Sequence, residues 1–194
     1  MNIVDRVKNI LITPKTEWAV INNETADPQS LLLTYVLPLA VLGACGNLLR
    51  GLLFAGTWGF KFFLISAIIG MVAGILSYYI TVIVVDMLAP SFASEKNMGK
   101  SAQLVAYAGT PSYIGAFLIF IPILGLLVSQ AAWAYGIYLM YLGIGPLKKT
   151  PEDKKVAYMI VAFLIMIVLY FILVAILGAI IYKAMGFEGY GLLG

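Results

Sequence analysis

The stretch LVAYAGTPSYIGAFLIFIPILGLLVSQAAWAYGIYLMYLGIGPL, residues 104–147, runs for more than forty residues without a charged side chain. As one straight helix it would be about 65 Å long, since a helix rises about 1.5 Å per residue. The hydrocarbon core of a bilayer is about 30 Å thick, so this stretch is expected to cross a membrane twice. The reversal is predicted near its middle, at Pro122 and Gly125. The sequence therefore indicates a polytopic membrane protein.

The composition narrows the possible functions. Of the 194 residues, 62% are hydrophobic and 11% are charged, whereas soluble domains average about 25% charged residues. The length suits one compact bundle, and no clustered basic face for nucleic acid is present. Because the chain has no histidine and Cys45 is its one cysteine, Cys/His zinc sites, internal disulfides and histidine-based triads are excluded. We expect no enzyme activity and no cofactor.

The apolar runs and the prolines between them predict an all-α membrane bundle of five transmembrane helices. The expected spans are about 30–53, 62–88, 102–120, a fourth that follows Pro122, and a fifth that reaches about residue 182. Asp27-Pro28 is a typical helix start for the first span, and Thr150-Pro151 for the fifth. Pro38 and Pro111 are expected to kink the first and third spans, and Gly143-Ile144-Gly145-Pro146 to end the fourth.

The chain is divided into an arm of residues 1–26, a five-helix domain of residues 27–185 and a short outer tail of residues 186–194. Apolar residues in the arm recur at helical spacing with charges between them, at Ile3, Val4, Val7, Ile10 and Leu11. This amphipathic helix is too short to span a membrane. It either lies in the headgroup layer, with Trp18 at the interface, or packs against the bundle.

Basic residues predict the orientation of the chain. An odd number of spans places the two termini on opposite sides. Segments on the N-terminal side carry nine Lys and Arg residues, and those on the other side carry three, Arg50, Lys61 and Lys183. The positive-inside rule therefore places the N-terminus in the cytoplasm and the C-terminus outside. An alkaline phosphatase fusion at Gly194 that stayed inactive in bacteria would contradict this orientation.

Two charged residues lie near the predicted ends of the spans. Asp86 is close to the inner end of the second span and Arg50 to the outer end of the first. Charges in the hydrocarbon core are costly and are often functional, but at these depths both residues can reach the headgroups. Asp86 is therefore either solvated or paired locally, or it belongs to a transport pathway.

Uncharged polar residues within the spans form a candidate intramembrane cluster with these charges: Asn47, Gln103, Tyr107, Thr110 and Gln130. In lipid each of them needs a hydrogen-bond partner. They either bridge neighbouring helices or line a polar cavity near the helix breaks at Pro38, Pro111 and Pro122. The hydroxyl of Thr110 is expected to satisfy the Tyr107 carbonyl that Pro111 leaves free.

Small residues at four-residue steps predict close helix packing, at Ser66, Gly70 and Gly74 in the second span and at Ala132 and Gly136 in the fourth. The packing is either within one chain or between the two chains of a homodimer. A basic loop follows the fourth span, and its lysines are candidate contacts for anionic lipid headgroups: Lys148, Lys149, Lys154 and Lys155.

Several motifs together resemble the Yip domain family. They are Tyr107-Ala108-Gly109-Thr110-Pro111, Pro122-Ile123-Leu124-Gly125, the tyrosine-rich fourth span, the loop LKKTPEDKK and the opening RVKNILITPKTEW. The resemblance implies a five-span bundle with a cytoplasmic N-terminus. For eukaryotic relatives it implies a role in vesicle trafficking and binding of Rab-type GTPases. This chain lacks their long soluble N-terminal region and its Asp-Leu-Tyr-Gly-Pro signature, so it is more similar to bacterial members and GTPase binding is not expected.

The leading hypothesis is a non-enzymatic protein of a bacterial plasma membrane that acts through protein or lipid contacts in membrane organisation, with the bilayer and its anionic lipids as partners. The alternative is a small channel or transporter, which requires the polar residues to converge on one hydrated cavity. A lipid-modifying enzyme would need an acid and a nucleophile near the inner interface, where Asp86 is the obvious candidate acid.

Overall fold

A computed structural model describes residues 2–54 and 56–184, with side chains throughout these ranges except at 56–59, 61 and 181–184. The predicted tail of residues 186–194 lies outside the described residues. Five helical stretches in the described part are long and apolar enough to cross a membrane: Pro28–Phe54, Phe62–Phe92, Met98–Phe120, Leu124–Lys148 and Glu152–Ile180. The prediction of an all-helical, five-span protein is confirmed.

The first span contains a local irregularity just before Pro38. Asp27 caps its start by accepting a hydrogen bond from the Ser30 N–H at 2.8 Å, as the sequence predicts. The helix then passes from α3 (Pro28–Leu31) through a π-helical turn, η1 (Leu32–Val36), into α4 (Leu37–Phe54). A proline has no N–H and its ring clashes with the carbonyl four residues earlier. The wider turn accommodates both effects, so Pro38 interrupts the helix as expected.

The third span is broken at Gly109. Helix α6 (Met98–Ala108) ends there and α7 (Thr110–Phe117) begins with Pro111 in its first turn. The expected bond from Thr110 to the Tyr107 carbonyl is wrong. The Thr110 hydroxyl instead pairs with the Tyr35 hydroxyl at 2.7 Å, which joins the third span to the first.

The reversal between the third and fourth spans lies where the sequence predicts it. After η3 (Leu118–Phe120) the chain turns at Pro122 and Ile123, and α8 begins at Leu124. Ile123 has a φ of 61°, and a Cβ on Gly125 would lie 2.3 Å from the Leu118 carbonyl oxygen. Glycine is therefore required at 125, because any side chain would collide with the returning backbone.

The fourth span does not end at Gly143–Pro146 as predicted. Helix α8 (Leu124–Lys148) continues through Pro146 and ends where Lys149 adopts a left-handed conformation. Gly143 instead allows close packing, since a Cβ there would lie 2.7 Å from Leu104 and 2.8 Å from Trp18. The predicted cap by Thr150 is also wrong: its hydroxyl donates to the Ile144 carbonyl, and α9 (Glu152–Ala184) begins two residues later.

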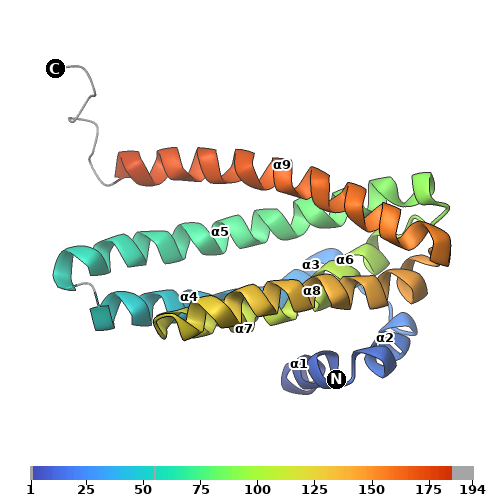
Figure 1. The fold of residues 1–194 in the computed structure, drawn as a ribbon, viewed down its shortest axis with the longest axis horizontal. Coiled ribbons are helices and arrows are strands. Elements are labelled where there is room, and N and C mark those ends of the chain that lie inside the picture. Colours follow the sequence, from blue (N-terminus) through green and yellow to red (C-terminus); the bar gives the residue numbers. More distant parts are fainter. Residues whose placement is uncertain (1, 55, 185–194) are drawn as a thin grey trace.

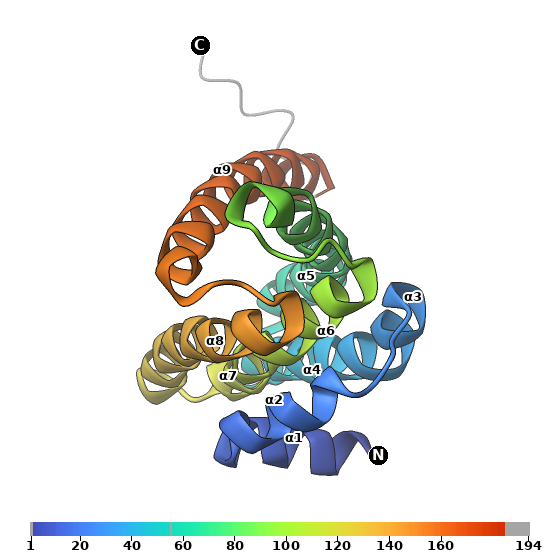
Figure 2. The same ribbon diagram turned by 90° about the vertical axis from the view of Figure 1, so that its right-hand side faces the viewer.

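The arrangement gives the bundle two different ends (Figure 1). The hairpin between α4 and α5 (Gly56–Leu88) forms one end. The other, here called the charged end, gathers the last turn of α8, the start of α9, and η2 (Ala89–Phe92), which follows α5. Helix α2 (Pro14–Asn22) lies near this end, whereas α1 (Ile3–Ile12) lies further along the bundle, beside α7 and the middle of α8 (Figure 1). Helix α1 runs across the direction of the spans (Figure 2).

The largest fully buried side chains gather towards the charged end, and they come from the arm as well as from the spans. They include Ile10, Trp18, Ile21, Leu104, Ile144, Leu147 and Tyr158. In contrast, α9 has the lowest buried share of the five spans. Burying apolar groups stabilises a fold only where water is the alternative. A dense core beside the headgroup layer is therefore expected to hold this bundle together.

Candidate functional site at the charged end of the bundle

An ion-pair cluster centred on Arg6 holds the segments of the arm together, and Arg6 also contacts Tyr107 of α6. The Arg6 guanidinium, 5% exposed as a residue, donates to Glu17 at 2.5 Å and to both oxygens of Glu24 at 2.5 and 2.6 Å. It also lies over the Tyr107 ring, 5.1 Å from the centroid. Burial alone would lower the pKa of Arg6, but the hydrogen bond to Glu24 and the nearby carboxylates raise it. The arginine therefore stays charged and ties three segments together.

Packing of the arm on the bundle, one of the two alternatives left open by the sequence, is confirmed. Trp18 is 1% exposed and meets Tyr107 edge-on with ring centroids 6.3 Å apart, so its ring packs inside the protein. The Tyr135 hydroxyl on α8 donates to the Leu11 carbonyl at 2.8 Å. Because the inner side of the arm is used in this way, its outer side is left exposed.

The outer face of the arm combines apolar and basic side chains. Val4 is 66% exposed and Ile12 68% exposed, and Lys8 and Lys15 are exposed beside them. Figure 2 shows α1 at the edge of the molecule, where it runs across the spans. Such a surface is typical of helices that lie in the headgroup layer. The inner side of the arm packs against the bundle, and its outer side is suited to the headgroup layer, so the two alternatives for the arm are compatible.

Two residues of α6 hold the end of α2. The Lys100 ammonium donates to the carbonyls of Asn22 and Glu24, each at 2.8 Å. The Gln103 amide donates to the Glu24 carbonyl at 3.2 Å. A cation at a helix C-terminus satisfies free carbonyls and interacts favourably with the helix dipole. Gln103 therefore bridges segments, and Lys100, which was not singled out in the sequence, joins it.

A second buried cluster joins the ends of α5, α6 and α8. The Lys148 ammonium donates to Asp86 Oδ1 at 3.0 Å, to Ser101 Oγ at 2.7 Å and to the Asn97 carbonyl at 3.3 Å. The same Asp86 oxygen accepts from the Asn97 N–H at 2.8 Å and from the Ser101 hydroxyl at 3.0 Å. Asp86 is thus paired locally, which is the structural one of its two predicted alternatives.

The four lysines of the basic loop have different environments, and two are not positioned for lipid headgroups. Lys148 is fully buried at 0% exposure and Lys155 is 8% exposed, with its ammonium 2.5 Å from Glu152. A headgroup contact at Lys148 is therefore ruled out by its burial. Lys154 is half-buried, and the Lys149 side chain is 76% exposed and pairs with Glu95 at 2.7 Å. This hydrogen bond holds the pKa of Glu95 below its usual value.

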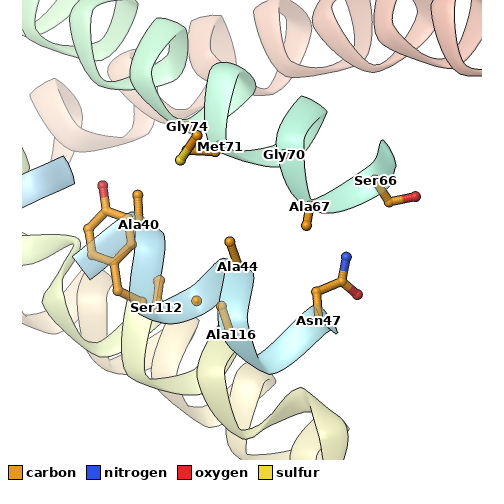
Figure 3. A pocket seen from close by; sticks show the side chains of 12 residues that line it. Ala40, Ala44, Asn47, Ser66, Ala67, Gly70, Met71, Gly74, Ser112 and Ala116 are labelled. Carbon is orange, nitrogen blue, oxygen red and sulfur yellow. The ribbon is translucent and has the colours of Figure 1, made fainter. Parts of the chain in front are cut away.

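The predicted intramembrane cluster is divided among separate places. Tyr107 and Thr110 belong to the buried contacts around Arg6 and Tyr35. Asn47 lines a cavity of about 330 Å³ between α4, α5 and α7 (Figure 3). Gln130 is exposed in a crevice of about 680 Å³ between α5, α8 and α9. Arg50 lies towards the hairpin end, with its guanidinium 5.9 Å from the centre of the Phe63 ring.

The small residues predicted to pack helices behave differently in the two spans. A Cβ on Gly136 would lie 2.9 Å from the Ala108 carbonyl oxygen, and one on Gly115 3.0 Å from Ala132, so α8 packs closely on α6 and α7. At Gly70 and Gly74 an added Cβ would meet nothing within 4 Å, and with Ser66 they line the cavity of Figure 3. The predicted packing on this stripe is not made within the chain.

Comparisons with known proteins give one result. No curated protein and no solved structure matches the chain. The family model described as the Yip1 domain matches residues 8–176, which include most of the arm and nearly all of the five spans. The chain therefore belongs to the Yip1 domain family.

Proposed function

We propose that this protein acts without catalysis in a bacterial plasma membrane, through contacts of its charged end with anionic lipids and with proteins there. The single observation that supports this most strongly is the arm. One side of it packs on the bundle through Trp18, Arg6 and Tyr107, and the other side presents exposed valine, isoleucine and lysine side chains. We infer a rigid interfacial platform that lies on the cytoplasmic leaflet.

The electrostatics agree with such a platform. A polybasic surface gains about 1 kcal/mol per Lys or Arg near an anionic membrane. Lys8 and Lys15 are exposed on the arm and Lys149 is exposed at the charged end, whereas Lys148 is buried in the fold. The proposed orientation places these exposed lysines against the cytoplasmic leaflet, where anionic headgroups concentrate.

The transport alternative has less support from the geometry. It requires the polar residues of the spans to meet in one cavity. Asn47 and Gln130 line two separate cavities, and Gln103 donates to backbone carbonyls. Within the described part of the chain, these groups do not outline a common polar path. Lipid and protein contact is therefore the function that we favour.

The test uses the full chain in proteoliposomes. A donor dye is placed at Ile12→Cys in a Cys45→Ala background, and energy transfer to headgroup-labelled phosphatidylglycerol is compared with transfer to headgroup-labelled phosphatidylcholine. We expect a preference for the anionic lipid that falls with added salt. In the Lys8→Gln/Lys15→Gln variant this preference for the anionic lipid should fall by about an order of magnitude or more. The expected drop corresponds to the loss of two lysines that contribute about 1 kcal/mol each.

The matched control is Lys8→Arg/Lys15→Arg, which keeps both positive charges at the same exposed positions and should leave the preference unchanged. Surface substitutions are preferable to deletion of residues 1–26, because the deletion would remove Ile10, Trp18 and Ile21 from the core. Equal transfer to the two lipids, unaffected by salt and by the lysine substitutions, would contradict the proposal.

A further inference from the structure

We propose that the groove between α4, α5 and α7 binds one acyl chain of a phospholipid whose phosphate is held by Arg50. The site lies towards the hairpin end of the bundle, away from the charged end, and does not depend on the function proposed above. Its walls are small: Ala40, Ala44 and Asn47 from α4 face Ser66, Gly70 and Gly74 from α5 (Figure 3).

The groove lies between two contacts of α5, one with α4 towards the hairpin and one with α3 towards the charged end. Towards the hairpin, a Cβ on Gly51 would lie 2.6 Å from Phe63, so the backbones there are close. Towards the charged end, the Tyr78 hydroxyl donates to the Pro28 carbonyl at 3.1 Å. Between these contacts, Gly70 and Gly74 have open space in front of them, and Ser112, Tyr113 and Ala116 of α7 form the back wall.

The dimensions fit an acyl chain better than a protein helix. From Ser66 to Gly74 the groove follows about 12 Å of helix, which is most of the roughly 15 Å depth of one leaflet. A cavity of about 150 Å³ holds one benzene ring, so the 330 Å³ here has room for about a dozen carbon atoms. A helix about 10 Å wide would need roughly 900 Å³ over the same length.

The polarity along the groove matches an amphipathic lipid. Asn47 and Ser66 lie together at one end (Figure 3). One helical turn further towards the hairpin is Arg50, exposed, with its guanidinium over Phe63. Arginine is suited to phosphate because its fork of N–H groups can bind two oxygens at once. A phosphate at Arg50 would place the ester groups beside Asn47 and Ser66 and the chain beside Gly70 and Gly74.

The test is lipid retention measured by native mass spectrometry on the full chain, loaded with dipalmitoyl phosphatidylglycerol in mild detergent. Gly70→Leu/Gly74→Leu fills the groove and should remove one retained lipid per chain. Gly178→Leu is the matched control, since an added Cβ there also meets nothing within 4 Å and the residue lies on α9, away from the groove. This control should retain lipid as the wild type does.

Arg50→Gln provides an independent variant, because it changes an exposed side chain and leaves the groove intact. It should weaken retention by about fivefold, the ratio that about 1 kcal/mol for one arginine near a lipid surface gives. Unchanged retention in either variant would overturn the proposal. So would loss of a dimer rather than of a lipid in Gly70→Leu/Gly74→Leu, because the stripe would then be a contact between two chains.

Discussion

The buried pair of Lys148 and Asp86 allows a quantitative prediction for Lys148→Met. All three N–H groups of the ammonium are used, by Asp86, by Ser101 and by the Asn97 carbonyl, and the side chain is 0% exposed. Methionine has a similar length and cannot replace these bonds. The substitution leaves the Asp86 carboxylate, 3% exposed, without its cation, which is expected to cost about 3–5 kcal/mol in the free energy of unfolding.

A double-mutant cycle separates the ion pair from simple loss of packing. Asp86→Asn leaves a buried ammonium without its counter-charge and should be destabilising to a similar degree. Asp86→Asn/Lys148→Met removes both charges, so its cost should fall short of the sum of the single costs by about 2–3 kcal/mol. The shortfall is the measured coupling between the two residues.

The free energy of unfolding is measured by reversible SDS titration in mixed micelles, followed by tryptophan fluorescence. The control is Lys149→Met, which changes the neighbouring, 76% exposed lysine and should have a much smaller effect than Lys148→Met. Two results would refute the reasoning: costs in the cycle that add within about 0.5 kcal/mol, or equal costs for the two lysine substitutions.

Two further predictions concern a pair of glycines and an exposed carboxylate. Gly46→Ala should destabilise by about 1–3 kcal/mol in the same titration, because its Cβ would lie 2.1 Å from the Phe117 carbonyl oxygen, whereas Gly70→Ala should be neutral or stabilising. NMR titration should show a pKa of Glu95 below its usual value of 4.5, and Lys149→Gln should raise this pKa again. Since its folded-state pKa is lowered, the stability from this contact is present above about pH 4.5 and is lost as pH falls through the lower value.

Local patterns were sufficient for most of the architecture. The spans follow from runs of apolar residues, because backbone in hydrocarbon must form helices long enough to cross it. The start at Asp27-Pro28 and the reversal at Pro122 and Gly125 follow from residue types that cap or break helices. Each of these features depends on neighbours in the sequence.

The same local rules failed where glycine or lysine served a contact between distant segments. Gly143 looked like a helix stop, but it makes room for Trp18 of the arm. The lysines of the loop could not be distinguished by sequence. Lys148 is buried because its ammonium donates to Asp86, 62 residues earlier, whereas Lys149 is exposed and pairs with Glu95. Ser66, Gly70 and Gly74 predicted a packed face and instead line a groove.

The sequence alone determined that five helices cross a membrane, where they turn back and that an amphipathic arm precedes them. Hydropathy, helix caps and prolines act over a few residues, so they can be read without knowing the fold. Only the tertiary structure decided that the arm packs on the bundle through Trp18 and Tyr107, that Lys148 is buried and that the polar residues do not share one cavity. These depend on which helix ends meet in space, and that is set by packing between segments far apart in the chain.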